Sequence, residues 1–450
     1  MSRLDWVNAL PQRWEAKPLR AVTDYVVSNV DKVPADGEVR VRLCNYTDVY
    51  NNEFITLDLD FMEATATQAE IARFGLAVDD VIITKDSESW DDIAVPALVR
   101  ETAPDLVCGY HLAILRPRKQ HIHGAFLLRC LQAKPVRVQL ELAANGVTRF
   151  GIPKSDIGSL RLPVPPLNVQ RAIADYLDRE TARIDALIAA KERLLALLAE
   201  KRRALITRAV TRGLDPNAPM KDSGIPWLGE IPAHWEIRQL KFVAINLQTG
   251  PFGTQLHAGE YITGGVPVVN PAHLKAGKIV TDERMTIDDV TAERLAIHRL
   301  KPGDLVLARR GEIGRCAVVE PAQAGWLCGT GSLRARLRRE VANPYYLALM
   351  FSHTLVSDTL VLESVGSTMD NLNTEILGSC RLPIPPLDEQ QAIVEHITEE
   401  TARLDALRAA TERSIALLKE RRAALISAAV TGQIDVPACA ASTADREAVP

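Results

Sequence analysis

The sequence has few aromatic residues, no long apolar run and no dominant charge. Phe, Trp and Tyr make up 5% of the 450 residues, so Leu, Ile, Val and Ala must build the cores. No stretch reaches the roughly 18 uncharged apolar residues of a membrane-spanning helix. The opening Met1–Trp6 lacks the apolar segment of a signal peptide. These absences favour a cytoplasmic protein that does not act on a membrane.

Signatures of bound cofactors and metals are missing as well. The seven cysteines are scattered, and no two have a C-x-x-C spacing, which favours reduced thiols over a zinc site or a disulfide framework. There is no phosphate-binding G-x-x-x-x-G-K-[ST] loop and no H-E-x-x-H metal motif. The tetrapeptide at 270–273, N-P-A-H, lacks the second proline of the N-P-P-aromatic motif of amino-methyltransferases. We therefore expect no catalytic residue, cofactor or metal in this chain.

What the sequence does contain is a duplication. Residues 161–215 and 381–435 share 32 identities over 55 positions at a constant offset of 220 residues. A fainter repeat opens each half, since Trp6, Trp14 and Leu19 recur as Trp227, Trp235 and Leu240. The stretches between these landmarks look unrelated. The expected plan is a variable domain at 1–160, a helical spacer at 161–215, a second variable domain at 216–380, a second spacer at 381–436 and a disordered tail at 437–450.

Each copy of the strong repeat predicts one long helix, the first over about 169–211. Asn168 and Asp388 follow a Pro-Pro pair where an N-cap belongs, and Gly213 and Gly432 stand where a C-cap belongs. Apolar residues recur with a period near seven, which favours an antiparallel coiled coil between the copies. Packing of each helix on its own domain is the alternative. The predicted seam consists of Ile173, Leu177, Ile184, Leu187, Leu194, Leu198, Leu205, Ile393, Ile397, Leu404, Leu407, Leu418 and Leu425.

The variable domains read as mixed α/β (α+β) domains. Short β-branched runs predict strands, and longer segments with helical periodicity predict helices. The predicted strands are 39–43, 78–84 and 136–142 in the first domain and 267–269, 305–308 and 333–337 in the second; the predicted helices are 64–73, 287–297 and 343–361.

Basic residues cluster in the second half of each variable domain. Residues 111–160 contain eight Lys or Arg against two acids, and residues 294–339 contain ten against three, although the net charge of the chain is −4. A single cluster would be read as a solvated, salt-bridged surface, but two clusters at corresponding places favour contact with DNA. The predicted DNA-contacting residues, which include loop Ser and Thr, are Lys85, Ser87, Arg116, Arg118, Lys119, Arg129, Thr148, Lys154, Arg309, Arg310, Arg315, Arg334, Arg336, Arg338, Ser367 and Thr368.

The alternation of divergent domain and repeated helix resembles the specificity subunit of type I restriction–modification enzymes. The matching motif L-P-x-P-P-L-x-x-Q stands at Leu162–Gln170 and Leu382–Gln390. Lys301–Arg309 is similar to a strand signature of that family's target recognition domains, and Asp79–Asp86 is its counterpart without the glycine. The resemblance covers the chain to about residue 436.

The resemblance implies a non-catalytic protein whose two domains each read one half of a bipartite double-stranded DNA site. The helices would set the spacing and bind two methyltransferase (modification) subunits that use S-adenosylmethionine to methylate adenine. Two restriction subunits, using ATP and Mg²⁺, could complete the complex. The alternatives are a coiled-coil adaptor without DNA recognition, a fused methyltransferase or nuclease, and a similar subunit of a methylation-only or fused restriction system.

Overall fold

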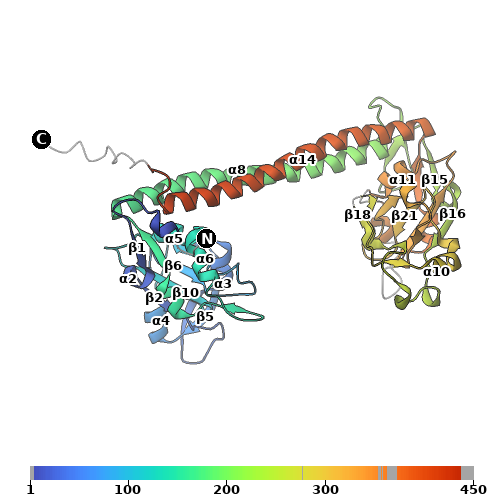
Figure 1. The fold of residues 1–450 in the computed structure, drawn as a ribbon. Coiled ribbons are helices and arrows are strands. Elements are labelled where there is room, and N and C mark those ends of the chain that lie inside the picture. The colour runs from blue at the N-terminus through green and yellow to red at the C-terminus, as the bar shows by residue number, and fades with distance from the viewer. Residues whose placement is uncertain (1–4, 276, 353–355, 357, 362–371, 437–450) are drawn as a thin grey trace. The chain divides into compact units, whose positions relative to one another are not determined.

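The computed structural model describes residues 5–275, 277–352, 356, 358–361 and 372–436. The chain divides into two compact units, of which the first contains residues 1–192 with 412–450 and the second residues 193–411. Each unit therefore combines one variable domain with part of each long helix (Figure 1). Ser367, Thr368 and the predicted tail 437–450 lie outside the described residues.

The two long helices are α8, Leu167–Arg212, and α14, Leu387–Val430. As predicted, each is followed closely by a glycine in the left-handed region, since Gly213 and Gly432 both have a φ of 71°. The predicted N-caps are wrong, because both helices begin one residue before Asn168 and Asp388. The carbonyl of the preceding proline, Pro166 or Pro386, already accepts the first helical hydrogen bonds, and the φ of proline suits a helix start.

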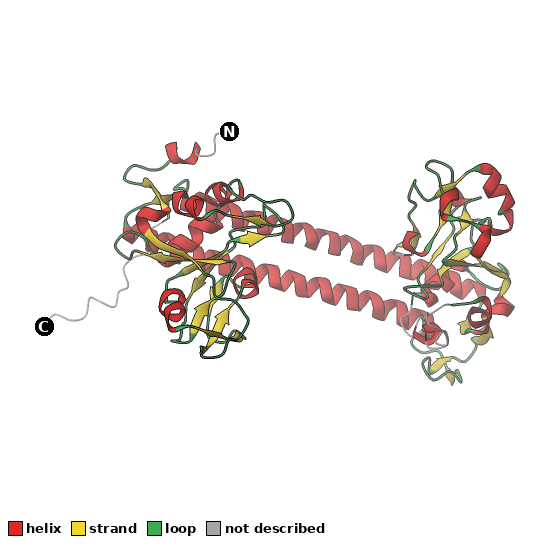
Figure 2. Ribbon diagram, turned by 90° about the horizontal axis from the view of Figure 1, so that it is seen from below, coloured by secondary structure: helices red, strands yellow, loops and turns green. Residues whose placement is uncertain are grey.

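Within each unit, the two helices pack antiparallel. In the first unit Arg422 of α14 pairs with Asp185 of α8 at 2.9 Å, and Lys419 lies 3.9 Å from Glu192. Residue numbers therefore increase along α8 in the direction in which they decrease along α14. In the second unit Arg202 pairs with Asp405 at 2.8 Å. This pair is the copy of Asp185–Arg422 at the 220-residue offset. Figure 2 shows the two helices side by side, and the predicted pairing is confirmed in each unit.

The predicted seam combines two rows, and the row through Leu177, Ile184 and Leu198 is buried more fully than the row through Ile173, Leu187 and Leu194. Leu177, Ile184 and Leu198 are buried, but Leu187 and Leu407 of the other row are each 47% exposed. The buried positions of α8 alternate in steps of three and four residues, which is the spacing of a coiled coil; they include Ala174, Leu177, Thr181, Ile184 and Ile188. In the row that contains Leu187, the buried position in the middle of the helices is therefore one residue later than predicted, at Ile188 in α8 and Ile415 in α14. The remaining predicted positions divide into buried Ile173, Ile393 and Ile397 and partly buried Leu194, Leu205, Leu404, Leu418 and Leu425.

The first variable domain contains a five-stranded and a three-stranded sheet. The larger has the order β2-β10-β6-β8-β4, and the smaller has the order β5-β3-β9 with β3 and β9 parallel. The strands are β2 Thr23–Val27, β10 Leu112–Pro117, β6 Val81–Thr84, β8 Pro96–Val99, β4 Phe54–Ile55, β5 Met62–Ala66, β3 Val39–Cys44 and β9 Leu106–Cys108.

The second variable domain repeats this topology. Its sheets have the orders β16-β24-β21-β22 and β20-β17-β23, with β17 and β23 parallel. The strands are β16 Ala244–Thr249, β24 Ser332–Leu337, β21 Leu305–Ala308, β22 Cys316–Val318, β20 Thr286–Ile287, β17 Val266–Val269 and β23 Leu327–Cys328. Two domains whose sequences look unrelated thus share one fold.

The faint opening repeat pairs with the start of the strong repeat. Strand β1, Glu15–Pro18, pairs antiparallel with β12, Arg161–Val164. In the second unit β15, Glu236–Gln239, pairs in the same way with β25, Arg381–Ile384. This pairing explains why both segments recur in both halves.

One predicted strand is a helix. Residues 136–141 belong to α6, Lys134–Glu141, which has Pro135 at its second position. This helix buries Val136 and Leu140 at i, i+4 spacing and pairs Glu141 with Lys134 and Arg137. The predicted helix at 64–73 starts later, since α4 is Gln68–Phe74. The helices predicted at 287–297 and 343–361 are represented by α10, Asp289–Arg294, and α11, Pro344–Phe351, and part of the latter range is not described.

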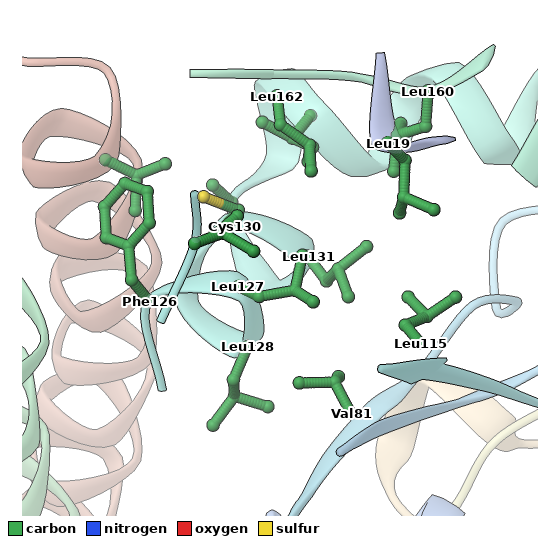
Figure 3. Close-up of a cluster of buried hydrophobic side chains, with 14 of the residues drawn as sticks. Leu19, Val81, Leu115, Phe126, Leu127, Leu128, Cys130, Leu131, Leu160 and Leu162 are labelled. Carbon is green, nitrogen blue, oxygen red and sulfur yellow. The ribbon is translucent and has the colours of Figure 1, made fainter. Parts of the chain in front are cut away.

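The core of the first unit lies around α5, Gly124–Gln132. Figure 3 shows Leu127, Leu128 and Leu131 of this helix directed toward Val81 and Leu115 of the large sheet. The same cluster includes Ile426 and Val430 of α14, so the end of the long helix is part of this core. The six described cysteines are all buried.

Candidate nucleic-acid interface

In each domain, three strand ends meet at one end of the larger sheet. In the first domain the end of β6 lies beside the start of β10, since Lys85 N–H donates to the His111 carbonyl at 2.8 Å. The end of β2 lies there as well, because Ser28 N–H donates to the Leu112 carbonyl at 3.0 Å. We call the group at this end, Lys85, Asp86, Ser87, His111 and Thr148, the first strand-end surface.

Asp86 organises the first strand-end surface. Its two carboxylate oxygens contact Lys85 Nζ at 3.1 Å and His111 Nδ1 at 2.6 Å. His111 has a φ of 67°, a backbone conformation that is uncommon for residues other than glycine. The carboxylate therefore helps to hold a lysine and a histidine side by side at the end of the sheet. Sequence reasoning missed His111, because no motif marks it.

A short antiparallel pairing between two distant segments brings Ser87 and Thr148 to the same end of the sheet. Strand β7, Asp86–Ser87, pairs with β11, Phe150–Gly151, and the exposed Thr148 lies two residues before β11. Ser87 is largely buried and interacts with the hydroxyl of Tyr46, whose pKa is raised mainly by burial. Thr148 is thus more accessible to a partner than Ser87.

The second domain has an equivalent group with different chemistry. Arg309 N–H donates to the Gly331 carbonyl at 3.0 Å, and Gly250 N–H donates to the Ser332 carbonyl at 2.9 Å. Arg315 joins them, because Ala308 N–H donates to its carbonyl at 2.8 Å. We call this group the second strand-end surface; it consists of Gly250, Phe252, Arg309, Arg310, Arg315 and Gly331.

The second strand-end surface is electropositive. The pKa of Arg309 is lowered, first by burial and then by the adjacent positive charge of Arg310. The Arg309 Nε donates to the Leu372 carbonyl at 3.2 Å, a neutral partner, while Arg310 is exposed. Arg315 pairs with exposed Glu312. An anion would relieve the repulsion between Arg309 and Arg310, which is the behaviour of a phosphate-binding position.

Four of the predicted DNA-contacting arginines form ion pairs or hydrogen bonds within the protein. Arg129 is 1% exposed and donates to Gln132, Glu53 and Asp178. Arg334 is 4% exposed and donates to the carbonyls of residues 297 and 299 and to the side chains of residues 246 and 248. Arg116 and Arg336 each form a bidentate ion pair with a buried aspartate. These internal contacts favour a structural role for Arg129, Arg334 and Arg336, whereas Arg116 remains exposed beside its aspartate.

The remaining predicted basic residues lie away from the strand-end surfaces. Arg118 and Lys119 follow β10, and Arg338 follows β24, so they lie at the opposite ends of these strands. Arg118 pairs with Asp24 at 2.6 Å, and Lys119 and Arg338 are exposed. Lys154 lies 5.9 Å from the centre of the Tyr25 ring. The structure therefore separates the predicted set into groups at two ends of each sheet.

The described part of the chain contains neither a candidate metal site nor a candidate membrane-spanning helix. There, no three His, Cys, Asp or Glu side chains gather in a way that could hold a metal ion. None of the helices described is both long and apolar enough to cross a membrane. The N-P-A-H tetrapeptide forms a turn in which Asn270 N–H donates to His273 Nδ1 at 3.2 Å.

Comparison with known proteins agrees with the duplicated architecture. Residues 234–415 match the family model of the type I restriction modification DNA specificity domain. The whole chain is similar to the EcoKI specificity subunit of Escherichia coli (strain K12), with 23% identity over 94% of this chain and 90% of the relative. Residues 234–415 thus resemble a type I DNA specificity domain, and nearly the whole chain is similar to type I specificity subunits. The MjaVIII specificity subunit of Methanocaldococcus jannaschii is 20% identical over 95% of this chain and 94% of that subunit.

Solved structures show the same fold. A chain from a structure on complex assembly and conformational transition of the type I R-M system superposes with a TM-score of 0.72 at 17% identity, covering 94% of this chain and 99% of that chain. The HsdS subunit of Thermoanaerobacter tengcongensis superposes with a TM-score of 0.53 at 17% identity, covering 94% and 98%. The family model stops short of the first domain, but the shared strand order identifies that domain as a second copy of the specificity-subunit fold.

Proposed function

We propose that this specificity subunit reads a bipartite DNA site with its two strand-end surfaces, one half-site per domain. The observation that carries the proposal is that the two domains have equivalent backbone arrangements at this end of the sheet but different side chains on them. Lys85 and His111 stand where the second domain has Arg309 and Gly331. Base edges are distinguished by the donors and acceptors presented to them. Different side chains on equivalent frames would therefore read different half-sites.

We propose further that the two long helices bind two copies of one methyltransferase subunit. Four exposed leucines support this, and they form two pairs at the 220-residue offset. Leu187 and Leu407 are each 47% exposed, and Leu197 and Leu417 are 60% and 65% exposed. Each unit contains one such leucine from each helix. A duplicated apolar feature fits two copies of one partner.

In this proposal the chemistry belongs to the partner subunits. S-adenosylmethionine would bind the methyltransferase subunits, and ATP with Mg²⁺ would bind two restriction subunits where the complex contains them. The assembly would act on double-stranded DNA in the cytoplasm. The contribution of this chain would be to select the sequence.

A domain exchange tests the proposal. Residues 1–160 are replaced by the corresponding domain of another specificity subunit, and methylated sites are mapped by single-molecule sequencing of genomic DNA. We expect one half of the methylated sequence to change and the other half to stay. A change in both halves, or methylation that is indifferent to the exchange, would contradict independent reading by the two domains.

A further inference from the structure

An exposed aromatic side chain stands on the second strand-end surface. Phe252 is 60% exposed, although the chain has only eight phenylalanines to build its cores. It follows β16 by three residues, immediately after the segment that Gly250 fastens to Ser332. Phe252 therefore projects from the end of the sheet that also carries Arg309 and Arg310.

The turn that carries Phe252 is held in place. Phe252 N–H donates to Gln255 Oε1 at 3.1 Å, and Gln255 N–H donates back to the Phe252 carbonyl at 3.2 Å. The Gln255 carbonyl in turn accepts from Arg294 Nη1 at 2.7 Å. The following Leu256 is buried. The ring is exposed on a turn with fixed contacts on both sides, which lowers the entropic cost of presenting it to a partner.

Glycines allow this turn to lie against the neighbouring loop. A Cβ added at Gly250 would lie 1.8 Å from the Gly329 carbonyl oxygen, and one added at Gly331 would lie 2.9 Å from Pro271. The loop that ends at Gly331 also accepts the Arg309 N–H. Close backbone packing thus links the turn that carries the phenylalanine to the two arginines.

We propose that Phe252 is a wedge that inserts at a base step of the half-site read by the second domain. This inference rests on the proposed function and extends it from contact with DNA to deformation of DNA. Apolar side chains inserted between bases partly unstack them and kink the duplex, and flexible pyrimidine–purine steps deform most easily. An exposed ring on a held turn, at the same end of the sheet as Arg309 and Arg310, matches a base stack flanked by phosphates. Part of the specificity of this domain then comes from the deformability of the step that receives Phe252.

Two exposed phenylalanines, one on each side of strand β16 in the chain, allow a matched test. Phe242 is 62% exposed and lies in α9, Leu240–Val243, just before β16, at the strand end opposite Phe252. The assembled methyltransferase complex carrying Phe252→Ala, Phe252→Trp or Phe242→Ala is titrated with its own site. The duplex carries a dye at each end, so that affinity and bending are measured together by energy transfer.

We expect Phe252→Ala to bind about tenfold more weakly, the loss expected for one stacking contact, and to abolish the bend. Phe252→Trp keeps the bend, and Phe242→Ala behaves as the wild type. Unchanged bending and affinity in Phe252→Ala overturn the wedge. Loss of complex assembly in Phe252→Ala also overturns it, by making Phe252 a contact with the partner protein. Failure of the wild-type complex to bind its own site would instead refute the proposed function itself.

Discussion

The guanidinium of Arg336 lies flat against the carboxylate of Asp304, with Nε 2.8 Å from Oδ1 and Nη2 2.7 Å from Oδ2. The first domain contains the same pair, Arg116 and Asp80, with distances of 2.9 and 2.7 Å. Each aspartate also accepts a backbone N–H three residues earlier in the chain. The pair thus fastens the turn before β6 or β21 to the neighbouring strand β10 or β24, and it occupies Nε and Nη2 of its arginine.

Removal of this carboxylate should destabilise the second domain. Asp304→Asn leaves a largely buried guanidinium without its counter-charge, and we expect the free energy of unfolding to fall by about 3 kcal/mol. Chemical denaturation of the chain measures this. Asp282→Asn breaks the exposed pair with Arg284 and serves as a control that should leave stability nearly unchanged. Equal stability of both variants would show that the buried pair is dispensable.

The arginines of the second strand-end surface should affect binding and not folding. Arg309→Ala with Arg310→Ala should weaken DNA binding by the assembled complex by about 1–3 kcal/mol if either reads a base edge. If they touch phosphates only, the loss should be the same for all sequences and the salt slope should become shallower by about one per contact. Arg238→Ala, which removes an exposed pair with Glu236 on β15, is the control. Binding unchanged at every salt concentration would identify the pair as a solvated surface.

The exposed leucines should govern the number of bound methyltransferase subunits. The double variant Leu197→Glu with Leu407→Glu alters the two exposed leucines of the second unit, and Leu187→Glu with Leu417→Glu alters those of the first unit. Each double variant should weaken the binding of one partner copy by roughly tenfold or more, since a charge replaces a buried Leu contact. Native mass spectrometry counts the copies. Ala199→Glu, at another exposed position of α8, is the control. If every variant retains two bound copies, these leucines do not contribute to binding of the methyltransferase subunits.

The helices should act as the ruler between the half-sites. Seven residues inserted after Ala199, with seven inserted after Arg408 on the facing part of α14, preserve the alternating steps of three and four along the seam. Each helix lengthens by about 10 Å, or about three base pairs at 3.4 Å each. We expect the same half-sites with a longer spacer when methylated sites are mapped. Two-residue insertions rotate the seam by about 200° and should abolish methylation, whereas an unchanged spacer after the seven-residue insertions would show that helix length does not set it.

The sequence alone determined the duplication, the long helices and their glycine ends, because these depend on local signals that repeat at one offset. It also located strands such as 305–308, where a short apolar run follows a turn. The sequence pattern placed part of the helix–helix contact at Leu187, because a seven-residue period is compatible with either of two adjacent positions on the helix. Only packing selects Ile188 over Leu187.

Tertiary structure decided which basic residues are free to meet DNA. Arg129 and Arg310 look alike in sequence, yet one is buried among carboxylates and the other is exposed at a strand end. Tertiary structure also brought Asp86 to His111 and placed Phe252 on the same surface as Arg309. These relationships join residues far apart in the chain through sheet pairing and close loop packing. No local pattern encodes them, because the availability of a side chain depends on partners that only the folded chain supplies.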